Sequence, residues 1–141
     1  MAFATIDNPE LYFQSVLWTG NQSTQAITFD GSEDMQPDFV WIKQRADDGY
    51  SHELFDVVRG VTKYITSDTN AAEATGGTTL TAFGSDGFTL GADTIVNKNT
   101  KTMVSWNWKA GTAFSNDASA TSVGSIDSAG SVSTDAGIGI I

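Results

Sequence analysis

The sequence predicts an all-β fold, a jelly-roll-like antiparallel sandwich, from three observations. Large apolar side chains alternate with polar ones over residues 39–43 and 102–109, and a period of two is typical of strands with two unlike faces. Short apolar runs recur along the chain with Gly, Asn or Asp turn signals between them, as in sandwiches and barrels. No window keeps a 3.6-residue period over a helical length, so we expect little helix.

The elements are expected in a simple order. A lead-in, residues 1–14, holds one helical turn, because Asn8 is a capping residue and Pro9 suits the first helical position. Strands at residues 16–19 and 25–29 are expected to pair as a hairpin across the short loop between them. The remaining strands of the body, which spans residues 15–111, are expected at 39–43, 63–67, 78–83, 87–90 and 102–109.

The aromatic residues indicate where the core lies. The chain has four tryptophans, Trp18, Trp41, Trp106 and Trp108. Alternation places Trp106 and Trp108 on one face of their strand, and Phe39 and Trp41 on one face of theirs. We expect Trp41, Phe88 and at least one of Trp106 and Trp108 to be buried in the core. Stacking against a sugar is the alternative role for the tryptophans.

The last thirty residues differ from the body in composition. Residues 112–141 are mostly Ser, Ala, Gly, Thr and Asp, so we expect a linker or an edge-strand extension that needs a partner. We expect Val132, Ile138, Ile140 and Ile141 to supply its contacts with neighbouring chains. Because the chain stops at two isoleucines, we also expect this extension to lead into a further module of a longer protein.

Charge and composition argue against several classes of partner. The chain has 141 residues, 7 basic against 17 acidic, and a net charge of −10. Binding to nucleic acid or to an anionic membrane requires basic surface, so neither is expected. There is no cysteine for a disulfide framework. No apolar run approaches the length of a membrane span, and the first residues lack the pattern of a signal peptide.

No group of residues has the pattern of an active site. His52 is the only histidine, and with Glu53 and Asp56 it lacks the second imidazole of most transition-metal sites; we expect it to make a structural hydrogen bond. The carboxylates of Asp47 and Asp48 lie in a polar loop, which favours a solvated turn over glycoside hydrolysis. The acidic segment 30–34 lacks the ligand ladder of an EF-hand, and a loose surface calcium site is its alternative. The chain is therefore not expected to be an enzyme or to need a cofactor.

Several single residues are candidates for ligand or interface contacts. Arg59 is expected to form a bidentate pair with Asp56 or a neighbouring carboxylate, with Gly60 at a positive φ; an anchor at a subunit contact is the alternative. Tyr50, His52 and Trp18 are further candidates, together with the extension residues named above.

A family resemblance spans most of the body. It is carried, in order, by YFQ at 12–14, LWTGN at 17–21, MQPDFVWIK at 35–43, DVVRGVTK at 56–63, FGSDGFTLG at 83–91 and SWNWKAG at 105–111. This succession resembles a module of marine bacteriophage proteins described as tail-fibre or other virion structural proteins. That module is similar to concanavalin-like and SPRY-type jelly rolls. In that family, the segment matching residues 135–141 often opens a following β module.

The resemblance implies a non-enzymatic structural component of a bacteriophage particle, made in the host cytoplasm and located in the virion. A tail fibre or appendage that mediates assembly and host attachment is the expected role. The alternatives are a lectin-like module that binds a host surface glycan and a capsid decoration protein. Expected partners are copies of the chain itself, with a trimer favoured, or other virion proteins.

Overall fold

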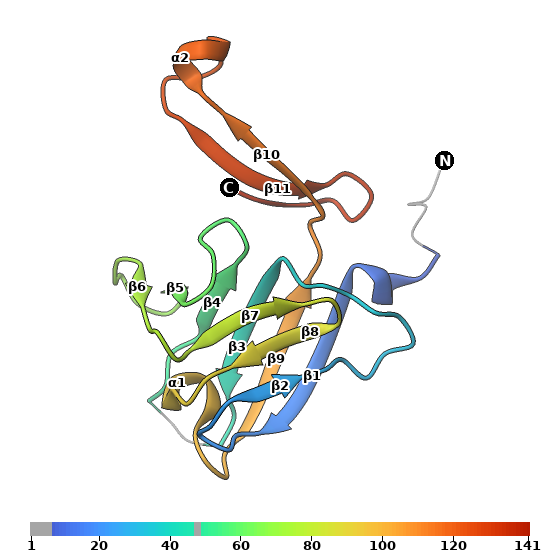
Figure 1. The fold of residues 1–141 in the computed structure, drawn as a ribbon, viewed down its shortest axis with the longest axis vertical. Coiled ribbons are helices and arrows are strands. Elements are labelled where there is room, and N and C mark those ends of the chain that lie inside the picture. The colour runs from blue at the N-terminus through green and yellow to red at the C-terminus, as the bar shows by residue number, and fades with distance from the viewer. Residues whose placement is uncertain (1–6, 47–48) are drawn as a thin grey trace.

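The computed structural model describes residues 7–46 and 49–141 as an antiparallel all-β sandwich with a projecting third sheet (Figure 1). The large sheet has the order β1 (Phe13–Thr19), β9 (Thr102–Trp108), β3 (Phe39–Gln44), β4 (Glu53–Asp56), β5 (Lys63–Thr66), β6 (Ala74–Thr75). The small sheet has the order β2 (Gln25–Ile27), β8 (Gly87–Leu90), β7 (Leu80–Gly84). The third sheet contains β10 (Thr112–Asn116), β11 (Ser128–Ser133) and β12 (Ile138–Ile140). The helical segments are η1 (Pro9–Leu11), α1 (Thr94–Asn97) and α2 (Ala118–Thr121).

The predicted fold class is confirmed, because the strands pair antiparallel throughout the described chain and the helical segments are short. The expected hairpin between residues 16–19 and 25–29 is wrong. β1 pairs with β9 in the large sheet, whereas β2 pairs with β8 in the small sheet. The loop between them carries the chain from one sheet to the other, and the side chain of Asn97 holds it by bonding to Asn21 and to the Ser23 carbonyl.

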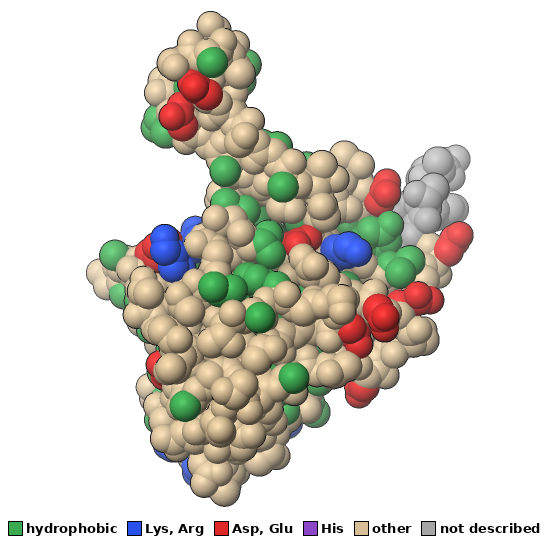
Figure 2. All heavy atoms as spheres, in the orientation of Figure 1, with side chains coloured by type: hydrophobic (Ala, Val, Ile, Leu, Met, Phe, Trp, Pro, Cys, Tyr) green, Lys and Arg blue, Asp and Glu red, His purple; other side chains and the backbone are tan. Residues whose placement is uncertain are grey.

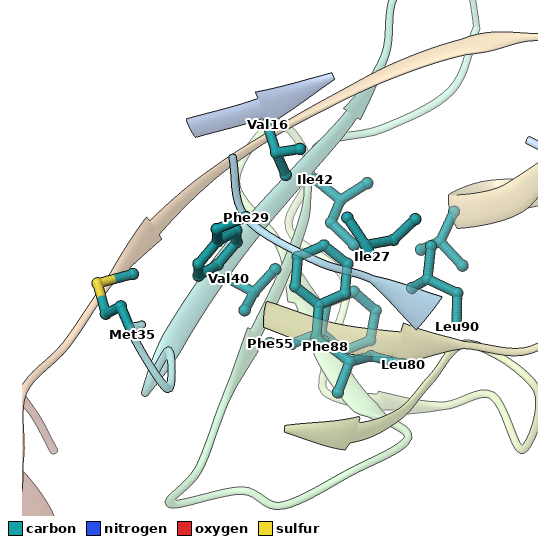
Figure 3. Close-up of a cluster of buried hydrophobic side chains, with 11 residues drawn as sticks. Val16, Ile27, Phe29, Met35, Val40, Ile42, Phe55, Leu80, Phe88 and Leu90 are labelled. Atoms are coloured by element: carbon teal, nitrogen blue, oxygen red, sulfur yellow. The ribbon is translucent and has the colours of Figure 1, made fainter. Parts of the chain in front are cut away.

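The hydrophobic core lies between the two sheets of the sandwich. Figure 3 shows the buried side chains meeting there from both sides. The large sheet contributes Val16, Val40, Ile42 and Phe55, and the small sheet contributes Ile27, Leu80, Phe88 and Leu90. Phe88 is 2% exposed, so its predicted burial is confirmed. Burying such side chains is worth roughly 1.5–3 kcal/mol each before entropy is counted.

Within the described part of the lead-in, the expected helical turn forms at Pro9–Leu11, whereas Phe13 and Gln14 belong to β1. Asn8 caps η1 by accepting the N–H of Glu10 at its side-chain oxygen, and Pro9 occupies the first helical turn. Glu10 then reaches the loop after β2, where its carboxylate accepts the N–H and hydroxyl of Ser32. These hydrogen bonds lower the pKa of Glu10, the side-chain bond contributing most.

Residues 112–141, expected as a linker or an edge strand, form the three strands β10, β11 and β12 and the short helix α2. Figures 1 and 2 show this projection standing away from the body. The buried carboxylate of Asp38 fixes its base by accepting the N–H groups of Ala110, at 2.8 Å, and Gly111. The projection therefore starts from a rigid point on the large sheet.

Candidate functional site: an aromatic face on the large sheet

The outer face of the large sheet, opposite the core, carries six aromatic rings in two rows. The rings of Phe13 and Phe39 flank Trp108, with centroid distances of 5.0 and 5.5 Å. We refer to these six residues together as the aromatic face: Phe13, Phe39, Trp41, His52, Trp106 and Trp108. In its second row, Trp41 contacts Trp106 at 5.8 Å and His52 at 5.6 Å, both in edge-to-face geometry. Tilted and edge-to-face pairs are the favoured arrangements of such rings.

Strand register explains why these rings meet. Phe13 and Phe39 lie directly across from Trp108, and Trp41 lies across from Trp106. Residues opposite each other on neighbouring antiparallel strands share a face. The three adjacent strands β1, β9 and β3 thus assemble the face from residues far apart in the sequence.

The expectation that Trp41 and one of Trp106 and Trp108 are buried is wrong. All three are only half-buried, whereas the residues that alternate with them, such as Val40, Ile42 and Asn107, are buried on the core side. Alternation identifies which side chains share a face, but it does not decide which face is covered by a second layer. In this sandwich, β8 and its neighbours cover the face of the smaller aliphatic side chains.

His52 makes the structural hydrogen bond expected of it. Its Nδ1 atom accepts the indole N–H of Trp41 at 2.8 Å. An Nδ1 atom that accepts a hydrogen bond carries no proton itself, so the N–H group of the ring lies at Nε2. His52 therefore holds Trp41 in a fixed orientation.

Tyr50 and Lys43 lie together near the C-terminal end of β3. The ammonium of Lys98 lies 5.0 Å from the centre of the Tyr50 ring, within range of a cation–π contact. The ammonium of Lys43 donates to the Tyr50 carbonyl. These contacts place Tyr50 in a structural role at the border of the aromatic face.

Arg59 pairs with Asp56, as the sequence predicts. The guanidinium bonds one carboxylate oxygen of Asp56, and the other oxygen accepts the N–H groups of Val58 and Arg59. Gly60 follows with a φ of 88°, also as predicted. Glu73 lies 3.6 Å from Nε of Arg59.

The remaining candidates fall into two groups. Trp18 packs on the core side, edge-on to Phe88 at 5.8 Å, so it does not join the aromatic face. Of the extension residues, Ile140 is 8% exposed within its own chain, whereas Val132 and Ile141 are exposed. Ile138 and Ile140 line a hollow of about 250 Å³ against Phe39 and Arg59 of the body.

Burial strongly changes the pKa of Glu53. It is 3% exposed, and its Oε2 atom has no hydrogen-bond partner among the described residues. Burial raises its pKa to about 7, and Asp68 and Asp93 add to the shift while Lys43 opposes it.

No group of three or more histidine or carboxylate side chains placed to hold a metal occurs within residues 7–46 and 49–141. The carboxylates at Asp47 and Asp48 lie outside the described residues. The acidic segment 30–34 is tied to the lead-in by Asn8 and Gln14, which donate to the Glu33 carboxylate and carbonyl.

Sequence reasoning missed two features of the site. Phe13 was assigned to the lead-in, yet it begins β1 and completes the first aromatic row. The sequence predicts no role for Asp38, yet its buried carboxylate anchors the projection. The extended alternation of residues 13–19 was the available signal for Phe13; no sequence pattern marks the distant partners of Asp38.

Fold and site together define a two-sheet antiparallel β-sandwich with an open aromatic face and a three-stranded projection. The chain belongs to the family described as Domain of unknown function (DUF7483), whose model matches residues 8–141. Searches of curated proteins and of solved structures gave no match. Within the described part of the chain, none of the helices has the length and apolar character needed to cross a bilayer.

Proposed function

We propose that this chain is a non-enzymatic structural component of a bacteriophage particle, in a tail fibre or appendage, and that it binds partner proteins through its aromatic face. The half-exposed rings of Trp41, Trp106 and Trp108 carry the proposal. The sequence resemblance to virion modules supports the setting. The proposed location is the virion, with a capsid decoration protein as the alternative position.

A protein partner suits this face for two physical reasons. Tryptophan and other aromatic residues are enriched at the centres of protein interfaces, where they supply large contact areas at low entropic cost. The rings also brace one another across three paired strands, so the surface is held rigid before binding. The partner is another virion protein or a further copy of the chain, and the exposed Ile141 of the projection offers it additional apolar surface.

The test is incorporation into the particle. In the phage that encodes the chain, mass spectrometry of purified particles is expected to detect the wild-type chain. A Trp41→Ser/Trp106→Ser double variant is expected to fold in isolation, as judged by circular dichroism, yet to be depleted from particles. Ile126→Ser, which removes an exposed apolar side chain from the projection, serves as the matched control. Absence of the wild-type chain from particles contradicts the proposal.

A lectin-like role is the second candidate, and the same tryptophans favour it. Exposed indole faces stack against the apolar faces of sugars, and Trp41 is held by His52 in a fixed orientation. Titration with host surface polysaccharide while monitoring tryptophan fluorescence tests this role. A saturable change that Trp41→Ala abolishes, combined with normal incorporation of the double variant, favours glycan binding over protein binding.

A further inference from the structure

β1 is an edge strand of the large sheet and pairs on one side only. Its neighbour is β9, in a register that places Val16 opposite Ser105. Hydrogen bonds join Tyr12 to Lys109 and Gly20 to Lys101 at the two ends of this ladder. Since bonded pairs alternate along an antiparallel ladder, the even-numbered residues of β1 bond to β9. The N–H and C=O groups of Phe13, Ser15, Leu17 and Thr19 therefore point to the open edge.

Native sheets blunt their edges with lysine, proline, bulges, very short strands or a covering loop. The loop residues Asp30 and Gly31 flank this edge across a groove at Phe13–Ser15, but the other devices are missing from β1. β1 is seven residues long, regular in register and without a charged residue or proline. Its odd-numbered side chains are exposed, with Leu17 at 62% and Phe13 at 37%. Among the described residues, the only hydrogen bond to these edge groups from outside the strand comes from the Gln25 amide to the Thr19 carbonyl.

The charges at the two ends of β1 differ in sign. Near Phe13, the carboxylates of Glu10 and Asp30 line a groove of about 220 Å³ along the strand, and Lys109 is the basic residue at that end. At the other end, Lys101 belongs to the loop that bonds to Gly20, whereas the ammonium of the neighbouring Lys98 lies over the Tyr50 ring. Antiparallel pairing with an identical strand brings the acidic end of one copy to the basic end of the other.

We propose that two copies of this chain pair antiparallel through their β1 edges, joining their large sheets into one continuous sheet. The two-fold axis passes at Ser15, which faces Ser15 of the second copy. Phe13 then lies opposite Leu17 of the second copy, so the two exposed apolar side chains of the edge cover each other. Such an isologous contact closes on itself as a dimer.

This dimer goes beyond the proposed function. It is held by the backbone edge of β1, whereas the proposed partner contact is centred on Trp41, Trp106 and Trp108 of the outer face; Phe13 belongs to both surfaces. Two-fold pairing also differs from the three-fold symmetry that the sequence led us to expect.

The experiment is sedimentation equilibrium on the full chain at micromolar to submillimolar concentration. Wild type is expected to show reversible dimerisation. Ser15→Pro removes an N–H group that points to the open edge. Leu17→Lys introduces a charge at a position whose side chain is 62% exposed. Each is expected to weaken the dimer at least about tenfold, which corresponds to about 1.4 kcal/mol. The control Ile126→Lys makes the same charge change on the projection and is expected to leave dimerisation unchanged.

Cysteine cross-linking gives a second measurement, because the chain contains no cysteine of its own. Ser15→Cys is expected to form a disulfide-linked dimer under mild oxidation, and Ser85→Cys, in the exposed β7–β8 turn, is not. A wild type that stays monomeric over the whole range overturns the proposal. An oligomer that both edge variants leave unchanged, or that Ser15→Cys fails to cross-link, also overturns it. Virion incorporation is measured separately, so a monomer that still enters particles refutes the edge contact alone.

Discussion

Glu53 shows at the scale of one residue how burial couples ionisation to stability. Its pKa in the folded chain is about 7, against 4.5 for the unperturbed group. Between these values the folded state binds more protons than the unfolded state, so the contribution of Glu53 to stability falls as pH rises from about 4.5 to 7. The full difference between the two pKa values corresponds to about 3 kcal/mol.

We therefore expect Glu53→Gln to raise stability relative to wild type at pH 8 and to leave it nearly unchanged at pH 4.5. Urea denaturation at both pH values measures this. Asp34→Asn changes the charge equally at an exposed position and serves as the control. If the stability difference between Glu53→Gln and wild type were the same at both pH values, the carboxyl would not be protonated in the fold.

Asp38 is the residue on which the base of the projection depends. Asp38→Ala leaves the N–H groups of Ala110 and Gly111 without their acceptor, and losing charge-assisted bonds in a buried setting costs about 2–4 kcal/mol. Asp38→Asn keeps one acceptor oxygen and should lose less. Thermal unfolding ranks the two variants, and hydrogen exchange at residues 110 and 111 should accelerate most in Asp38→Ala. Unchanged exchange there would remove Asp38 from this role.

Trp41 and Phe88 are both large aromatics on strands, but their environments differ. Phe88 is enclosed in the core, so Phe88→Ala should cost about 3–5 kcal/mol. Trp41 is half-buried on the outer face, so Trp41→Ala should cost clearly less, about 1–2 kcal/mol, mostly from lost ring contacts. Chemical denaturation of both variants measures the difference; equal losses would mean that the outer face is covered.

At the scale of elements, the projection is expected to be less stable than the sandwich. Its described buried positions are few, namely Gly130, Ser131 and Ile140. Phe114 compensates in part by packing its ring over Gly130, where an added Cβ would meet the ring at 2.6 Å. Three short strands with so little apolar burial are marginal without further support.

Hydrogen exchange of the isolated chain should therefore show faster exchange in β10, β11 and β12 than in β3 and β9. A chain ending at Gly111 should keep the spectrum of a folded β protein, because the core residues all precede it. Protection of the projection equal to that of the central strands, or unfolding of the shortened chain, would show that the two parts form one cooperative unit.

The same scale shows what sequence reasoning can and cannot provide. The positions of β3, β5, β7, β8 and β9 follow from alternation and turn residues, whereas β4 and β6 do not. The capping of η1 follows from Asn8 and Pro9. The pairing partners of the strands cannot be predicted from the local sequence. β1 pairs with β9, which lies about ninety residues away in the chain, and such a distant pairing produces no local sequence pattern. The placement of Trp41, Trp106 and Trp108 likewise depended on which face the small sheet covers.

For the whole molecule, the central question is what covers the aromatic face. The sandwich leaves its most aromatic surface half-exposed and its longest edge strand unpaired on one side, while the core is filled by smaller aliphatic side chains and Phe55 and Phe88. Large exposed apolar surfaces on soluble proteins usually mark contacts with other molecules. The exposed aromatic surface therefore supports the proposal that this chain acts in assembly.

An electron cryo-microscopy map of the particle whose genome encodes this chain tests that placement most directly. We expect density for the sandwich in a tail fibre, appendage or capsid decoration, with another protein chain packed over Trp41, Trp106 and Trp108. Particles that contain no density for this chain, or in which those three side chains face solvent, would contradict the account.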